Sequence, residues 1–346
     1  MYHSNIRIME NILENTLIEL QESFKQHQWP GFRAKQVYAW LHKKLTFSFD
    51  AMTDLPKDLR NNLKNIYCIG LLNSKYVTTS KDGTKKFLFE LEDGNLIESV
   101  LLKDITGRKT VCLSTQAGCP LKCDFCATGN IDFKRNLTLS EIIGQAYRIA
   151  EKNADLSNLV FMGMGEPFLN YDNVIKSIHI LISKEGANFG QRKITISTCG
   201  IPDGIRKFAE EEFQVRLAIS LNSASNQVRS KLMPINRKYP LAAVRDALVF
   251  YQKKTGRRVT LEYVMLDGVN DRQEDLKDLR RFCEGLDVNV NLIPFNPFGR
   301  KFRPSKLAAV HHFENGLAAA DINTIVRRSK GTDILAACGQ LAGKAE

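Results

Sequence analysis

The sequence predicts an α/β protein in which a partial barrel of six β/α units follows a small N-terminal module of helices and β-hairpins. Three observations predict this fold. From about residue 108 onward, short apolar runs alternate with amphipathic stretches, as strands and helices do in parallel β/α folds. Residues 74 to 104 alternate like strands around Asp82-Gly83 and Asp93-Gly94, which are hairpin turn signals. Before them, apolar residues recur with helical spacing.

The N-terminal helical pattern extends from residue 5 to about residue 67, with Val37, Trp40 and Leu41 on one face. Breaks are expected at Pro30-Gly31 and at Asp54-Leu-Pro56. The sequence is therefore divided into four parts: a helical module (1–72), a β-hairpin linker region (73–107), the partial barrel (108–330) and a C-terminal segment (331–346).

Six strands and six helices are expected in the barrel. The strands are 109–115, 157–162, 193–197, 215–221, 258–266 and 288–294. The helices lie near 140–152, 171–184, 202–211, 240–254, 271–285 and 307–328. Such units imply parallel strands, and the absence of a seventh and eighth unit predicts an incomplete barrel. A doubly wound sheet is the rival topology. In both cases the reactive side chains should follow the carboxyl ends of the strands.

Composition and charge narrow the classes of protein. The 346 residues include 49 Lys and Arg against 38 Asp and Glu, a net charge of +11 that favours a polyanionic partner, RNA or DNA first. No apolar run approaches the roughly 18 residues that a membrane helix requires, and no signal peptide is evident. We expect a cytoplasmic protein. The eight cysteines are too few and too irregular for a secreted disulfide framework.

Three of these cysteines form the most informative motif. Cys119, Cys123 and Cys126 have the spacing Cys-x3-Cys-x2-Cys and directly follow the first predicted barrel strand. Three thiolates can hold a [4Fe–4S] cluster and leave one iron open, which can chelate the amino and carboxylate groups of S-adenosylmethionine (SAM). A structural zinc site is the alternative, but zinc would need a fourth cysteine or histidine close by.

Polar or glycine residues follow the later strands at the same end. Gly163, Gly165 and Glu166 end the second strand, where glycines allow a ligand to approach the backbone and the carboxylate can neutralise an ammonium group. Later candidates for hydrogen bonds to SAM are Ser197, Thr198, Ser220, Asn222 and Asn296. Each one alone is more often a turn or capping residue, but their recurrence favours a ligand.

Two further cysteines, Cys112 and Cys338, lie before and after the three-cysteine loop and the strand-end residues in the sequence. Cys112 lies in the first barrel strand, and Cys338 lies in a run of small residues near the C-terminus. From their surroundings alone, both are more often buried spectators than catalytic thiols.

At this point the sequence resembles a known family, the RlmN and Cfr class of radical SAM RNA methyltransferases. The resemblance covers nearly the whole chain and is carried by these blocks, in family order: Phe32-Arg-Ala-Lys-Gln-Val, Phe49-Asp-Ala-Met-Thr, Ile97-Glu-Ser-Val, the three-cysteine loop, Gly163-Met-Gly-Glu-Pro167, Ile196-Ser-Thr198, Leu217-Ala-Ile-Ser-Leu-Asn222, Lys231-Leu-Met-Pro-Ile-Asn236, Asn291-Leu-Ile-Pro and Ala337-Cys-Gly-Gln-Leu341. Asn222 stands where the family commonly has histidine, and Cys199 is an unusual successor to the Ser-Thr pair.

The resemblance implies a radical SAM barrel and specific residue roles. Cys338 would carry a methyl group taken from one SAM, and a second SAM would supply the radical that activates it. Cys112 would resolve the protein–RNA crosslink by forming a disulfide with Cys338, and Glu98 would accept a proton. The SAM contacts implied are Gly165, Glu166, Ser197, Ser220, Leu221, Asn222 and Asn296, beside a cluster on Cys119, Cys123 and Cys126.

The resemblance also implies the substrate and partners. The substrates are C2 of an adenine in the peptidyl-transferase centre of 23S rRNA and C2 of the adenosine 3′ of the anticodon in certain tRNAs. The protein partner is a flavodoxin-type electron donor. The N-terminal module would help to bind RNA, and the protein would act as a monomer. Methylation of C8, as in Cfr, is the near alternative. A non-catalytic, zinc-containing RNA-binding module is the alternative from a different class.

Overall fold

The computed structural model describes residues 9–153 and 155–343, and within them the chain forms two compact units. The first unit contains residues 9–73, 137–153 and 172–190, and the second contains 74–136, 155–171 and 191–343. Residues 5 to 8 of the predicted N-terminal helical pattern lie outside the described residues. None of the helices in the described part of the chain has the length and apolar character needed to span a membrane.

The first unit is helical, and it includes residues 137–153 and 172–190, which the sequence analysis assigned to the barrel. Its helices are α1 (Leu17–Gln26), α2 (Gly31–His42), α3 (Lys57–Ile66), α4 (Leu139–Ala150) and α5 (Tyr171–Ile182), with short 3-10 turns at Ile12–Glu14 and Phe49–Ala51. The two-residue strands β1 (Glu10–Asn11) and β2 (Tyr67–Cys68) pair in parallel. Both predicted breaks mark helix starts, because Pro30 caps α2 and Pro56 caps α3. Val37 and Leu41 are buried, whereas Trp40 is only half-buried.

Side chains of the N-terminal region hold α4 and α5 within this unit. The carboxylate of Glu14 accepts the backbone amides of Leu139 and Ser140 at 3.1 and 3.0 Å, at the start of α4. Glu19 pairs with Lys176 of α5 at 2.5 Å. A carboxylate at a helix N-terminus satisfies free amides and complements the helix dipole. Residues far apart in sequence therefore make one packed unit.

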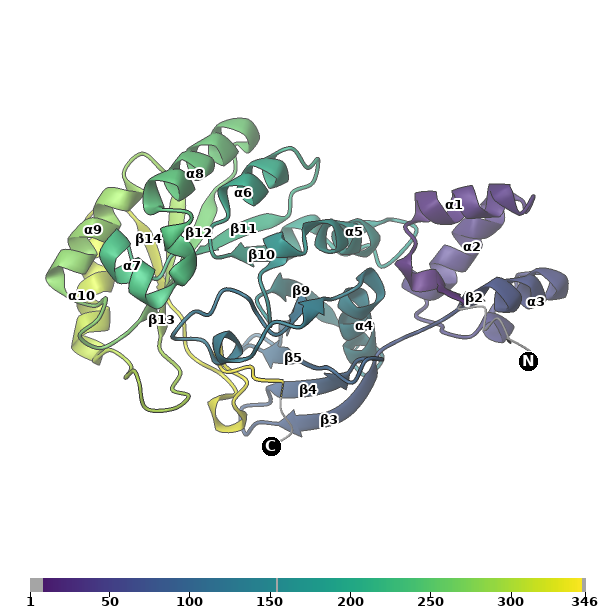
Figure 1. Ribbon diagram of the computed structural model, residues 1–346, viewed down its shortest axis with the longest axis horizontal. Coiled ribbons are helices and arrows are strands. Elements are labelled where there is room, and N and C mark those ends of the chain that lie inside the picture. Colours follow the sequence, from purple (N-terminus) through teal and green to yellow (C-terminus); the bar gives the residue numbers. More distant parts are fainter. Residues whose placement is uncertain (1–8, 154, 344–346) are drawn as a thin grey trace, which may run out of the picture. The chain divides into compact units, whose positions relative to one another are not determined.

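The second unit is built on one ten-stranded sheet in the order β14-β13-β12-β11-β10-β9-β6-β5-β4-β3 (Figure 1). Its strands are β3 (Asn73–Thr79), β4 (Lys85–Glu90), β5 (Leu96–Lys103), β6 (Lys109–Cys112), β9 (Leu156–Phe161), β10 (Ile194–Thr198), β11 (Arg216–Ser220), β12 (Val259–Met265), β13 (Val288–Pro294) and β14 (Asn323–Val326). A separate pair joins β7 (Gln116–Ala117) to β8 (Arg135–Asn136). The helices are α6 (Pro202–Ala209), α7 (Asn226–Leu232), α8 (Leu241–Thr255), α9 (Gln273–Cys283) and α10 (Leu307–Ala318), with short 3-10 turns such as Ala127–Asn130, Pro167–Leu169 and Pro234–Arg237.

The strand order distinguishes the two candidate topologies. From β6 to β14 the parallel strands follow one another in sequence order, without the reversal that defines a doubly wound sheet. The sheet has two free edges, at β14 and β3, so the barrel is partial, as predicted. Strands β3 to β5 form the predicted hairpins and extend this sheet through the antiparallel pairing of β5 with β6.

One sequence prediction is wrong. The last helix was expected to run from 307 to 328, but α10 ends at Ala318, and β14 follows as a seventh parallel strand beside β13. The chain turns at Asp321, which has a left-handed φ of 54°. Residues 323–326 include three β-branched side chains, and β-branched residues favour strands over helices. The short helix α7 was also not foreseen.

Candidate functional site

The loop after β7 brings the three motif cysteines to one cavity. Cys126 donates its backbone amide to the carbonyl of Cys123 at 3.1 Å and caps the 3-10 turn that follows. A Cβ on Gly118 would lie 2.2 Å from the carbonyl oxygen of Asp132, so only glycine allows this close approach. Cys119, Cys123 and Cys126 all line a cavity of about 170 Å³, which we call the thiol cavity.

The thiols of this loop influence one another. Burial raises the pKa of Cys119 to about 12 and raises the pKa of Cys123 as well, and the neighbouring thiols raise both further. Metal binding must therefore displace the protons, as it does in thiolate sites generally. No three His, Cys, Asp or Glu side chains within residues 9–153 and 155–343 are grouped to hold a single metal ion. A cubane cluster makes a different demand, because each thiolate binds its own iron at a separate corner. Three thiols from one loop beside a cavity fit that donor set.

The strand ends supply the rest of the thiol cavity. Seven of the polar or glycine residues singled out in the sequence line it, namely Gly163, Gly165, Glu166, Ser197, Ser220, Asn222 and Asn296. Leu221 does not line it, because its side chain is fully buried in the core. The hydroxyl groups of Ser197 and Ser220 lie 3.4 Å apart on neighbouring strands. The predicted convergence at the carboxyl ends of the strands is present.

Glu166 is held by backbone amides. Its Oε1 accepts the amide of Phe168 at 3.0 Å, and its Oε2 accepts the amide of Cys199 at 2.8 Å. Burial raises the pKa of Glu166, while these hydrogen bonds oppose the rise. Position 163 requires glycine on structural grounds as well, since a Cβ there would lie 2.6 Å from Ser114 Oγ. The motif therefore shapes the wall of the thiol cavity.

Asn222 has a left-handed φ of 57°, a conformation that asparagine tolerates better than most residues. Its side-chain oxygen accepts the amide of Val264 at 3.0 Å, and its carbonyl accepts Asn270 Nδ2 at 2.7 Å. Asparagine in place of the family's usual histidine thus fits the local backbone. Its side-chain oxygen is therefore already occupied by a hydrogen bond within the protein.

A band of polar residues across the sheet was missed by sequence reasoning. Ser220, Glu262 and Asn291 are aligned on β11, β12 and β13 by strand register. Asn291 Nδ2 donates to Glu262 Oε1 at 2.9 Å, and Arg327 Nη1 lies 3.9 Å from the same oxygen. Glu262 Oε2 is buried without a hydrogen-bond partner, and the residue lines the thiol cavity. The signal available in the sequence was a charged residue inside an otherwise apolar strand.

The segment that contains Cys338 is fixed by hydrogen bonds on several sides. Asn296 Nδ2 donates to the carbonyl of Cys338 at 3.1 Å, and Thr128 Oγ1 donates to the carbonyl of Leu341 at 2.7 Å. A Cβ on Gly339, which has a φ of 83°, would lie 3.2 Å from the carbonyl of Phe125. The small residues therefore allow the close approach to the cysteine loop that the sequence indicated.

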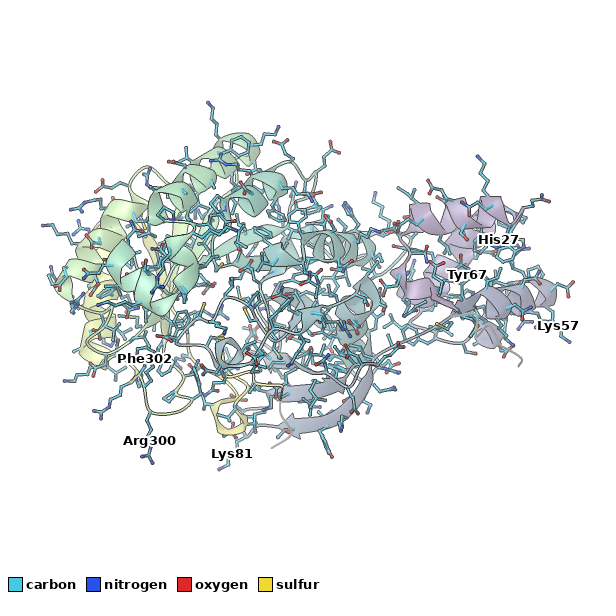
Figure 2. The ribbon with its side chains drawn as sticks, viewed as in Figure 1. His27, Lys57, Tyr67, Lys81, Arg300 and Phe302 are labelled. Carbon is cyan, nitrogen blue, oxygen red and sulfur yellow. The ribbon has the colours of Figure 1, made fainter. Side chains whose placement is uncertain are left out.

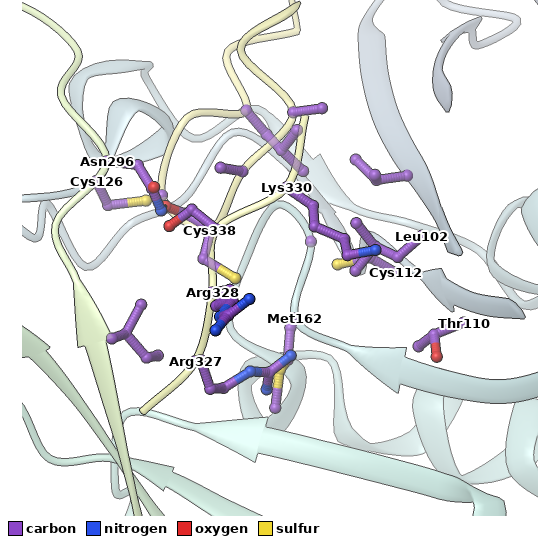
Figure 3. Close-up of a pocket in the computed structure, with 18 of the residues that line it drawn as sticks. Leu102, Thr110, Cys112, Cys126, Met162, Asn296, Arg327, Arg328, Lys330 and Cys338 are labelled. Atoms are coloured by element: carbon purple, nitrogen blue, oxygen red, sulfur yellow. The ribbon is translucent and has the colours of Figure 1, made fainter. Parts of the chain in front are cut away.

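Cys338 and Cys112 line a second cavity, of about 300 Å³, which we call the basic cavity. Its charged lining residues are Asp104, Arg108, Arg327, Arg328 and Lys330. Figure 3 shows the two thiols and the side chains of Arg327, Arg328 and Lys330 around this space. Cys126, Asn296, Arg327 and Cys338 line both cavities, so the two are contiguous.

The two thiols differ in exposure. Cys112 is 9% exposed on β6, whereas Cys338 is exposed to the solvent in the cavities. Burial raises the pKa of Cys112 to about 12, and a charge on Cys338 would raise it further. The pKa of Cys338 is also raised by the protein around it, while Arg327 acts to lower it. Each thiol is therefore within electrostatic range of the other.

Glu98 lies elsewhere. On β5 it lines neither cavity, and its Oε1 pairs with Lys86 at 3.2 Å. Its Oε2 accepts the backbone amides of Ala342 and Gly343 at 2.7 and 3.0 Å. The carboxylate thus anchors the segment a few residues beyond Cys338.

Known proteins match the chain over most of its length. A family model described as the radical SAM superfamily matches residues 113–283, and one described as the ribosomal RNA large subunit methyltransferase N-terminal domain matches 10–69. A protein of Dictyoglomus turgidum described as a probable dual-specificity RNA methyltransferase RlmN is 45% identical over 96% of this chain and 97% of its own length. A protein of Thermotoga maritima with the same description is 46% identical over 96% of this chain and 97% of its own length.

A solved structure is similar over the whole fold. The crystal structure of a radical SAM methyltransferase from Sphaerobacter thermophilus superposes with a TM-score of 0.91 at 42% identity. The match covers 97% of this chain and 100% of that chain.

Proposed function

The chain belongs to the RlmN family of dual-specificity RNA methyltransferases within the radical SAM superfamily, and we propose that it methylates C2 of adenine in two RNAs. These are an adenine in the peptidyl-transferase centre of 23S rRNA and the adenosine 3′ of the anticodon in certain tRNAs. The observation that carries the proposal is that Cys112, Cys338 and the loop cysteine Cys126 line one cavity, which is ringed by cations.

As a radical SAM enzyme, the protein uses a [4Fe–4S] cluster and SAM. Cys119, Cys123 and Cys126 would hold the cluster, and the polar strand ends of the thiol cavity would orient SAM. When bound, these cofactors supply a 5′-deoxyadenosyl radical.

Cys338 would carry the methyl group. Its exposed thiol lines both cavities, with the thiol cavity on one side and the basic cavity on the other. A carrier suits this chemistry because C2 of adenine is electrophilic, so direct displacement on SAM cannot methylate it. The hydrogen bond from Asn296 to its carbonyl positions the thiol between the two sites.

Cys112 would resolve the adduct between Cys338 and RNA. Attack of its thiolate on the sulfur of Cys338 forms a disulfide, breaks the bond from that sulfur to the transferred carbon, and leaves this carbon to take up a proton as a methyl group. Burial raises the pKa of the Cys112 thiol, so its proton must leave for the attack and is available to the released carbon. The resemblance gives Glu98 the proton lost from C2, but this carboxylate lines neither cavity and accepts the amides of Ala342 and Gly343, which supports an anchoring role for it.

The cationic lining of the basic cavity would bind RNA phosphates around the target base. A second cationic group lies on the loop after β13, where Arg300 and Arg303 are exposed and Phe302 is half-buried (Figure 2). An aromatic ring among cations is suited to stacking on an unpaired base. We further propose that the protein works in the cytoplasm as a monomer and receives electrons from a flavodoxin-type donor.

Mass spectrometry of 23S rRNA and tRNA from cells with and without the gene tests the substrate and the position. The expected result is 2-methyladenosine in both RNAs that disappears with the gene. A methyl group on C8 would identify the Cfr-like reaction instead. Unchanged RNA together with a colourless protein that holds zinc and no iron after anaerobic purification would favour the non-catalytic RNA-binding module.

A further inference from the structure

Arg229 is a buried cation that the reaction described above does not use. Among the lysine and arginine residues that the structure describes, only Lys86 and Arg229 are buried. Lys86 is paired with Glu98 at 3.2 Å. Arg229 has an exposed fraction of 0% and forms no ion pair with any carboxylate in the described part of the chain. A buried charge without a counter-charge is costly, so its presence calls for an explanation.

The partners of Arg229 are all neutral. Its Nε donates to the carbonyl of Leu221 at 3.0 Å, and its Nη1 donates to Asn236 Oδ1 at 2.9 Å. Its Nη2 donates to the carbonyls of Cys199 and Ser220 at 2.5 and 3.5 Å. These bonds fix the guanidinium group at the turns after β10 and β11. They satisfy its donors but leave its charge uncompensated.

The ionisable groups that act on Arg229 are thiols. Burial lowers the pKa of Arg229, whereas Cys199 and Cys123 act to raise it. In return, Arg229 acts to lower the pKa of Cys123, which Glu166 and the other loop cysteines raise. Helix α7, which carries Arg229, is bonded to the same loop, because the amide of Asp124 donates to the carbonyl of Leu232 at 2.9 Å. Cys199 and Ser220, whose carbonyls accept hydrogen bonds from Arg229, line the thiol cavity together with Cys119, Cys123 and Cys126. The cation is therefore fixed beside the wall of the cavity where the cluster would be held.

We propose that Arg229 is the counter-charge of the iron–sulfur cluster and favours its reduced state. A cubane on three thiolates is anionic, and it gains one more negative charge when it accepts an electron from a low-potential flavoprotein donor. A fixed cation in a poorly solvated interior stabilises that added charge more than the oxidised state. Arg229 touches neither SAM nor RNA in this role, so it is a positioning residue that acts through the cluster.

The test is a potentiometric titration of the reconstituted holoenzyme, followed by the visible and paramagnetic resonance signals of the cluster. Arg229→Gln removes the charge and keeps donors for the carbonyls, whereas Arg229→Lys keeps the charge and loses the planar fork. At a fixed solution potential, the ratio of reduced to oxidised cluster should fall about tenfold in Arg229→Gln. This is equivalent to lowering the reduction potential by ~59 mV for one electron. The ratio should stay close to the wild-type value in Arg229→Lys. Arg281→Gln, on the surface of α9, is the matched control and should change nothing.

Equal shifts in the Gln and Lys variants, or no shift in either, would overturn the proposal and leave Arg229 a purely structural hydrogen-bond donor. Loss of the cluster from both variants would have the same meaning. Loss from Arg229→Gln alone would support the proposal, since the two variants differ in charge.

Thermal unfolding provides a second readout that is independent of activity. Cluster assembly should raise the Tm less in Arg229→Gln than in the wild type, because the uncharged variant has no cation for the cluster to neutralise. Comparing each protein with its own cluster-free form cancels the effect of the altered hydrogen bonds. An equal rise in Tm in both proteins would contradict the assignment.

Discussion

Lys86 Nζ lies 3.2 Å from Glu98 Oε1, and both side chains are buried, at 8% and 1% exposure. Removing one partner of a buried pair leaves a charge without compensation, so Lys86→Met should destabilise the protein by about 3–5 kcal/mol in chemical denaturation. Lys75, whose pair with Glu90 is exposed, is the matched control, and Lys75→Met should cost about 0–1 kcal/mol. Adding Glu98→Gln to Lys86→Met should recover part of the loss. Equal costs for the two lysines would mean that the buried pair is well solvated.

Cys112 and Cys338 should behave differently when replaced, because the proposed mechanism gives them different steps. Cys338→Ala has no thiol to carry the methyl group and should form neither methylated RNA nor any covalent adduct. Cys112→Ala should still attack the adenine but fail to release it, so a protein–RNA crosslink should accumulate. Denaturing gels with labelled RNA would show the crosslink as a slowly migrating band. A crosslink in Cys338→Ala would reopen Cys199 as the carrier.

Arg327 should control the reactivity of the Cys338 thiol. Its positive charge acts to lower the pKa of Cys338, so Arg327→Met should raise that pKa, reduce the thiolate fraction and move the pH profile of alkylation to higher pH. Alkylation by iodoacetamide at a mildly alkaline pH should become several-fold slower, as followed by mass spectrometry of the Cys338 peptide. Arg328→Met is the matched control, since Arg328 lines the basic cavity without such an effect on the thiol. If both variants slowed alkylation equally, the effect would come from the total positive charge of the cavity and not from Arg327 in particular.

RNA binding should weaken as salt rises, and the slope should report the cations that touch phosphate. Arg328→Ala should reduce the slope of log K against log salt by about one unit if Arg328 contacts one phosphate. Fluorescence anisotropy with an rRNA fragment would measure it. Arg281→Ala, on an exposed helix, should leave the slope unchanged. The same slope in all three proteins would place the RNA away from the basic cavity.

The features that the sequence predicted depend on short-range patterns. The three-cysteine loop, the hairpin turns and the β/α alternation each depend on residues within one element or one loop, so periodicity and spacing reveal them. Strand β14 was not predicted because its four residues follow a helix after a brief left-handed turn at Asp321. Sequence spacing carries no signal for such a turn.

The missed site features depend on contacts across the sheet or between distant segments. Arg229 reads as an ordinary surface cation in a short polar stretch, and only the turns after two other strands enclose it. Glu262 needs the register of β12 with β13 to meet Asn291. The role of Glu98 as an anchor depends on amides more than 240 residues further along the chain. No local pattern contains these pairings.

That long-range anchoring has a consequence for the order of assembly during synthesis. The cysteine loop and the strands that line the thiol cavity are translated before residues 337–343, which close the site against Glu98, Thr128 and Asn296. The growing chain can therefore form the sheet and present its three thiols while the Cys338 side of the cavity is still open. We expect iron and sulfide to reach the thiols more readily during that interval. The carrier thiol arrives only afterwards, on a segment that cannot be held in place until the surface that receives it has folded.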